Sequence, residues 1–138
     1  MRLGELPGFA RELLATARVG HLGLLDEERL PRVLPVTFAL HEDALWSAVD
    51  DKPKRVEADE LARVRWLRRR PRAALCVDRY DDDWTRLAWV QVLGKVEVLE
   101  ASDAPLRALA DKYPQYADRA PAGPLLRLEP ERTLHWRP

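Results

Sequence analysis

Along the chain, apolar residues recur either every three to four positions, as in a helix, or at every second position, as in a strand. The spacing changes several times from one segment to the next. Helical spacing predicts three helices, over residues 8–18, 58–70 and 102–113, and a short helical turn within 113–121. Alternating polarity or enrichment in β-forming residues predicts six strands, over residues 19–25, 32–40, 43–49, 71–80, 86–100 and 124–136. The polar segment 50–57 is expected to be a loop.

The strand predicted over residues 86–100 has the clearest pattern. Apolar residues occupy positions 88, 90, 92, 96 and 98, while positions 91, 95 and 97 carry Gln, Lys and Glu. Successive side chains of a strand point to opposite faces, so one face is expected to lie in the core. Gly94 falls in the apolar register, where a missing side chain allows a bend or the close approach of another backbone.

The order of these elements predicts a mainly β fold of the α+β class. Most strands follow one another directly in the sequence, which favours an antiparallel sheet rolled into a barrel, with the helices at its edges. A chain of 138 residues corresponds to a single domain, expected over residues 1–138.

Composition narrows the class of protein further. An apolar content of 46% and a charged content of 33% exclude a disordered chain and a membrane-embedded one. The 23 basic and 23 acidic residues balance, so nucleic acid is an unlikely partner for the chain as a whole. A single cysteine, Cys76, and an N-terminus without a long apolar run lead us to expect a cytoplasmic protein.

Familiar catalytic motifs are absent. The sequence has no glycine-rich phosphate loop and no nucleophile elbow, and we assign no catalytic residue. We expect no metal site, because His21, His41 and His135 are far apart and the acidic run at 81–83 lacks calcium-loop spacing. Two classes remain, a binding module or an enzyme whose chemistry belongs to a cofactor.

Local charge is strongly asymmetric. Between residues 52 and 72 the chain carries nine basic and three acidic residues. Lys52, Lys54 and Arg55 directly follow a predicted strand, where side chains at a sheet end converge on a phosphate or carboxylate, so we expect these three to bind an anion. The later arginines of this segment are expected to form a solvated helix face.

Two groups of residues are candidates for contact with a flat ligand. In the strand predicted over 32–40, one face carries Leu34, Val36, Phe38 and Leu40, and the other carries the smaller Val33, Pro35, Thr37 and Ala39. The smaller face suits a ring system, although Pro35 is equally consistent with a simple edge strand. Farther along lie aromatic and polar side chains expected to seal a subunit interface or stack on a ligand, namely Tyr80, Trp84, Trp89 and Gln91.

Taken together, these segments resemble the pyridoxamine 5'-phosphate oxidase-like split β-barrel superfamily. The resemblance is to its B-type branch of enzymes that depend on the deazaflavin coenzyme F420. It rests on LPVTFAL (34–40), LWSAVDDKPKR (45–55) and the segment 67–98, in which VDRYDDDWTRL is the most specific part. The resemblance implies a six-stranded antiparallel split β-barrel of the type that binds flavin mononucleotide (FMN), with flanking helices. It also implies a homodimer with the cofactor in a groove between two barrels.

The resemblance further implies a function and a set of cofactor-binding residues. Pro35, Val36 and Thr37 would lie along the ring, and a second set would approach the ribityl and phosphate groups, namely Ser47, Ala48, Lys52, Lys54 and Arg55. Tyr80, Trp84, Trp89 and Gln91 would lie at the dimer groove. The function implied is hydride transfer between F420 and a small organic substrate. The alternatives are an FMN-dependent enzyme of the same fold and a module that binds a cofactor or nucleic acid without turnover.

Overall fold

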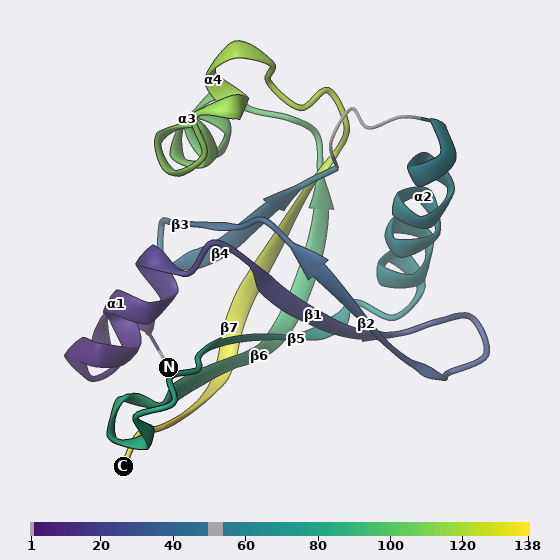
Figure 1. Cartoon of the computed structure of the whole chain (residues 1–138). Helices are drawn as coiled ribbons and strands as arrows, with labels where there is room; N and C mark the ends of the chain where they lie inside the picture. Colours follow the sequence, from purple (N-terminus) through teal and green to yellow (C-terminus); the bar gives the residue numbers. More distant parts are fainter. Residues whose placement is uncertain (1, 50–53) are drawn as a thin grey trace.

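The computed structural model describes residues 2–49 and 54–138, with the backbone alone over 54–61 (Figure 1). The helices are α1 (Gly8–Thr16), α2 (Lys54–Arg69), α3 (Asp103–Lys112) and α4 (Gln115–Asp118), and 3₁₀ turns lie at Leu3–Glu5 and Trp84–Arg86. The strands are β1 (Gly20–Leu25), β2 (Pro31–Val36), β3 (Ala39–His41), β4 (Ala44–Ala48), β5 (Arg72–Arg79), β6 (Ala88–Leu99) and β7 (Leu125–Trp136).

The strands form one antiparallel sheet in the order β2-β1-β5-β6-β7-β4-β3. The sheet curls strongly, but β2 and β3 form its two edges and are not paired with each other, so the barrel is not closed. The prediction of an antiparallel, mainly β fold with flanking helices is confirmed. The prediction of six strands is wrong, because the structure describes seven.

The extra strand arises where the segment predicted as one strand over 32–40 breaks at Thr37 and Phe38. Before the break, Val36 pairs with Gly20 of β1; after it, Ala39 pairs with Trp46 of β4. Two consecutive strands therefore join opposite edges of the sheet. The prediction that Ala39 shares an open face with Pro35 is wrong, because the chain turns at the break and Ala39 is only 3% exposed.

Helix α2 begins four residues earlier than predicted. Residues 54–57 were expected to belong to a loop, but they form the first turn of α2. They read Lys-Arg-Val-Glu and contain neither glycine nor proline, and three of the four residue types favour helix. The rest of the expected loop lies outside the described residues.

Gly94 lies at a bulge that bends β6 across β7. The register shifts between Leu93 and Gly94, and Gly94 is opposite Pro130. A Cβ atom at Gly94 would overlap the carbonyl oxygen of Glu129. The prediction of a close backbone approach at this glycine is therefore confirmed, and β7 runs through Pro130 without interruption because a bulge accommodates proline.

The core has two parts. The larger part packs the inner face of the sheet against α1 and α2, with Leu14, Leu67 and Val90 essentially inaccessible. The smaller part packs α3 against β3 and β4 through Leu109 and Trp46. Among the residues described, no helix is long and apolar enough to cross a membrane.

Candidate cofactor site

The site predicted from the sequence is built around the break between β2 and β3. The hydroxyl of Ser47 donates a hydrogen bond to the carbonyl oxygen of Thr37 (2.7 Å), which joins the break to β4. Pro35 is exposed and Thr37 half-buried, whereas the side chains of Val36, Ser47 and Ala48 are buried. Pro35 and Thr37 thus present the accessible surface, with Thr37 held to β4 by Ser47 and Pro35 paired with His21 of β1.

The basic residues follow directly in the chain. Strand β4 ends at Ala48 and α2 begins at Lys54. Lys54 and Arg55 therefore belong to the first turn of a helix, where free N–H groups and the helix dipole favour an anion. Lys52 lies outside the described residues.

Two tyrosines tie the break to the region of α3 and α4. The Tyr113 hydroxyl accepts a hydrogen bond from the Phe38 amide (3.1 Å) and donates one to the Arg18 carbonyl oxygen (2.9 Å). Burial raises the pKa of Tyr113, which keeps this hydroxyl protonated as the donor. The Tyr116 hydroxyl lies 2.8 Å from that of Thr37. The exposed end of the break is thus held by hydroxyl groups from far along the chain.

Lys112, beside Tyr113, is an unusual cation. Its Nζ lies 3.7 Å from the centre of the Phe38 ring and makes no hydrogen bond with any residue that the structure describes. Burial, together with the charge of Arg18, lowers the pKa of Lys112 to about 8. The Arg18 guanidinium stacks over Tyr113 at 4.7 Å, so two cations border the same pair of aromatic rings.

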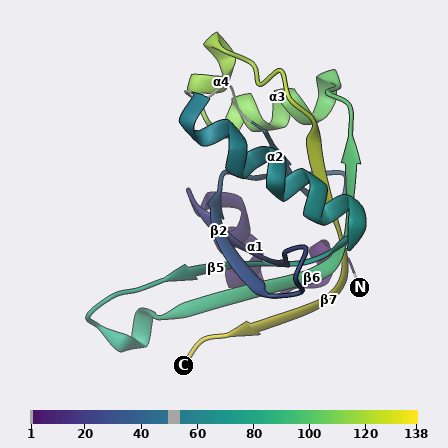
Figure 2. The same cartoon turned by 90° about the vertical axis from the view of Figure 1, so that its right-hand side faces the viewer.

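The predicted aromatic residues lie elsewhere. Tyr80 and Trp84, 72% and 68% exposed, occupy the tip that joins β5 to β6, while Trp89 and Gln91 are half-buried on β6. Figure 2 shows this tip at the end of an arm that extends away from α2, and Figure 1 also separates the two. One copy of the chain therefore does not bring Tyr80 or Trp84 to the basic end of the site.

The acidic residues at this tip shape the turn. Asp83 accepts hydrogen bonds from the amide (3.1 Å) and the hydroxyl (2.7 Å) of Thr85, and these bonds lower the pKa of Asp83. Asp81 accepts a bond from the Asp83 amide and pairs with Arg86 at 3.3 Å. Across 2–49 and 54–138, no group of His, Cys, Asp and Glu is arranged to hold a metal ion.

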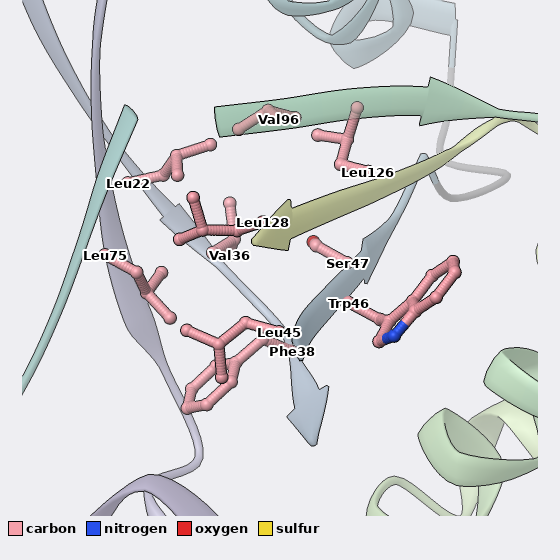
Figure 3. A pocket seen from close by; sticks show the side chains of 10 residues that line it. All are labelled: Leu22, Val36, Phe38, Leu45, Trp46, Ser47, Leu75, Val96, Leu126 and Leu128. Atoms are coloured by element: carbon pink, nitrogen blue, oxygen red, sulfur yellow. The ribbon is translucent and has the colours of Figure 1, made fainter. Parts of the chain in front are cut away.

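A small cavity on the inner face of the sheet cannot hold a cofactor. It measures about 20 Å³, close to the space that one water needs, and its walls are almost entirely apolar (Figure 3). Ser47 supplies the polar group nearest to it, but that hydroxyl already bonds Thr37. The cavity belongs to the core, and a cofactor requires the outer surface.

The sequence reasoning did not identify Arg18, Lys112, Tyr113 or Tyr116. The one available signal was the KYPQY segment, where a lysine and two tyrosines follow a predicted helix. Nothing local to that segment indicates contact with residues 37 and 38, which are more than 70 positions away.

The curled antiparallel sheet with split edges, flanked by helices, defines the pyridoxamine 5'-phosphate oxidase-like fold. A sequence model of the pyridoxamine 5'-phosphate oxidase family matches residues 6–137. The chain belongs to this family. No curated protein sequence matches it.

Solved structures agree on the fold while differing in the ligands that they are named for. An F420 reductase is 21% identical, with a TM-score of 0.68, and the match covers 94% of this chain and 98% of the reductase. An FAD-binding protein from Mesorhizobium loti is 20% identical (TM-score 0.64; 94% of each chain). The heme storage protein HutZ from Vibrio cholerae is 15% identical (TM-score 0.71; 99% of this chain and 95% of HutZ). At these identities the likeness shows the fold alone.

Proposed function

We propose that the chain is an oxidoreductase that binds coenzyme F420 and transfers a hydride between the deazaflavin and a small organic substrate. The observation that carries the proposal is the start of α2 at Lys54, which places two bases at a helix N-terminus soon after β4. This donor set fits a phosphate-bearing cofactor, because guanidinium, ammonium and free backbone N–H groups all bind phosphate.

The ring system would lie against Pro35 and Thr37. Pro35 has no N–H, and β2 forms an edge of the sheet, so a flat ring at this edge leaves no strand partner displaced. The ring would be flanked by Val36 and supported from behind by Ser47 and Ala48. In this arrangement Pro35 can both belong to an edge strand and contact the ring, so the two interpretations of this residue are compatible.

A second copy of the chain would complete the site. Tyr80, Trp84, Trp89 and Gln91 lie on the β5–β6 arm, away from the basic end, so they would reach the cofactor held by the partner. An open groove of about 530 Å³ runs over β1, β2, β5, β6 and β7, and most of its surface is apolar. Its lining also includes four charged residues, Arg32, Arg72, Glu131 and Arg132. Val33, at its edge, is 68% exposed. Such an apolar face is typical of an interface between subunits.

The cofactor supplies the redox chemistry, a hydride exchanged at C5 of the deazaflavin. The protein's own residues orient the ring, neutralise the phosphate and exclude water from the groove. Lys52, Lys54 and Arg55 would neutralise the charge of the phosphate, and Tyr80 and Trp84 of a second copy would cover the ring. Because the cofactor would supply the redox chemistry, the reaction needs no nucleophilic side chain, and the sequence contains no nucleophile motif.

FMN is the alternative cofactor, since relatives of this fold are named for several ligands. FMN carries a short phosphate tail, whereas F420 adds an anionic oligoglutamate chain, and the bases at Lys54 and Arg55 favour the longer tail. Arg72, which belongs to the same basic segment of the sequence, does not add to them, because it follows the other end of α2 and pairs with Glu131. A non-catalytic binding module is the other alternative, and nucleic-acid binding in particular would weaken steeply with salt.

A fluorescence titration with F420 and with FMN at two salt concentrations tests the proposal. We expect stoichiometric binding of F420 that is tighter than binding of FMN and less sensitive to salt than nucleic-acid binding would be. Reversing two charges in K54E/R55E should weaken F420 binding tenfold or more, because losing charge-assisted bonds to an anion costs roughly 1.5–3 kcal/mol each.

The matched control is R65E/R69E, which changes the net charge equally on the far part of the same helix, where Arg65 and Arg69 are exposed. Its affinity for F420 should be close to that of the parent. Equal losses in both variants would mean that the cofactor responds only to overall charge. Binding of an oligonucleotide but of neither cofactor below about 100 μM would refute the enzyme, since a charge-driven nucleic-acid binder behaves in that way.

A further inference from the structure

A groove on the side of α3 that faces α1 has the features of a second anion-binding site. An open groove of about 560 Å³ lies between the end of α1, β3 and α3. Its walls include the small side chains of Ala15, Ala39 and Ala108 and the basic side chains of Arg18 and Lys112. A groove of this volume has the size of a typical small-molecule site.

The two cations have no counter-ion within the described ranges. Arg18 and Lys112 form no ion pair with any described residue, whereas Arg127, for example, pairs with Glu97 and Glu129. The Lys112 Nζ atom also has no hydrogen-bond acceptor among the described residues and rests on the Phe38 ring. Arg18 is exposed and the Lys112 side chain is half-buried, but the Lys112 Nζ atom itself is inaccessible. A buried ammonium group normally has a partner, and an anion in the groove would supply one.

The opposing charge at the groove is a single carboxylate. Asp111 lines the groove but forms no ion pair with either cation among the residues described, and its side chain is exposed. The lining therefore carries two positive charges against one negative charge. The planar guanidinium of Arg18 suits bidentate recognition of a carboxylate or phosphate, and the flexible four-carbon stem of Lys112 allows its ammonium to turn from Phe38 into the groove.

We propose that this groove binds a small oxyanion, a carboxylate or a phosphate group, through Arg18 and Lys112. Among the described residues, none of α2 lines this groove. The groove is coupled to the break between β2 and β3, because Lys112 packs on Phe38 and Tyr113 bonds the Phe38 amide. An anion in the groove therefore acts on the same short segment that contains Thr37.

The experiment is a nuclear magnetic resonance titration of the ¹⁵N-labelled protein with sodium succinate and, separately, with sodium phosphate, at an ionic strength held constant with sodium chloride. We expect saturable shifts of the backbone amides of Thr16, Arg18, Leu40 and Lys112 at millimolar ligand. If only succinate saturates the shifts, the ligand is a carboxylate. If only phosphate saturates them, the ligand is a phosphate. Either result supports the site.

Variants separate specific binding from general charge effects. R18Q and K112M should each raise the dissociation constant at the groove tenfold or more, whereas R107Q, on an exposed position of the same helix, should leave it unchanged. K54E/R55E should also leave it unchanged, which keeps the result independent of the cofactor site. Shifts that chloride reproduces, or affinities that R18Q and K112M do not alter, would overturn the proposal.

Discussion

Tyr113 is the residue on which the geometry of the break between β2 and β3 depends most. Its hydroxyl bonds the backbone at both Phe38 and Arg18, and Tyr113 itself is only 6% exposed. We expect Y113F to lower the free energy of unfolding by about 1–3 kcal/mol, because the Phe38 amide loses its partner while buried. Urea denaturation measures this loss. Y80F, at an exposed tyrosine, should change stability by less than about 0.5 kcal/mol, and similar losses in both variants would contradict this role.

Lys112 should make stability depend on pH. Its folded pKa of about 8 lies below the ordinary value of 10.5, so protonation disfavours the folded state below pH 8, and the penalty disappears as the pH rises toward 10.5. We expect K112M to raise the free energy of unfolding by about 1 kcal/mol at pH 7, after allowance for the partial exposure of the side chain and its contact with Phe38. The gain over the parent should shrink at pH 10. R107M is the control, and a K112M protein less stable than the parent at pH 7 would contradict the assignment.

At the level of elements, the bulge at Gly94 fixes how β6 and β7 cross. G94A should lower the free energy of unfolding by about 3 kcal/mol or more, because the new Cβ atom would overlap backbone rather than a movable side chain. G23A in β1 is the matched control. There a Cβ atom would lie 3.8 Å from the Ala74 carbonyl oxygen, which is an ordinary van der Waals distance. Thermal denaturation compares the two. Equal stability of the two variants would show that the bulge tolerates a side chain.

The elements were also the part of the fold most open to prediction from the sequence. The period of the apolar residues alone located the ends of β6 within two residues and those of α3 within one, since each element buries one face. The break at Thr37 was not predictable, because residues 32–40 read as one continuous alternation. What separates β2 from β3 is pairing with β1 and β4, and these partners meet only in the folded sheet.

The candidate site shows the same limit. The bases at 52, 54 and 55 stand out as a local run, and their binding of an anion stays a prediction from the sequence. The structure adds that Lys54 and Arg55 begin α2, which the sequence did not predict. Tyr113 and Tyr116 reach residues 38 and 37 across 75 and 79 positions. Contacts at that separation are set by how α3 packs on β3 and β4, and a single sequence carries no local signal for them.

At the scale of the whole molecule, we expect a homodimer. Light scattering after gel filtration should give twice the chain mass of 15.9 kDa. V33D should shift the protein toward monomer, because it places a charge in the apolar groove over β1, β2 and β5. L99D, at a partly exposed apolar position at the end of β6, is the control and should remain dimeric. If the parent protein is monomeric at micromolar concentration, the proposal that two copies of the chain form each cofactor site is contradicted.

The most direct test of the central claim is cofactor binding by a mixed dimer. One chain carries K54E/R55E, the other carries Y80A/W84A, and the two are co-purified through different tags. If the basic end of one copy and the aromatic arm of the other form each site, one site of the mixed dimer is intact and the other doubly altered. We then expect one F420 per dimer bound with the affinity of the parent, while each variant homodimer binds weakly. Two equally weakened sites in the mixed dimer would contradict the claim.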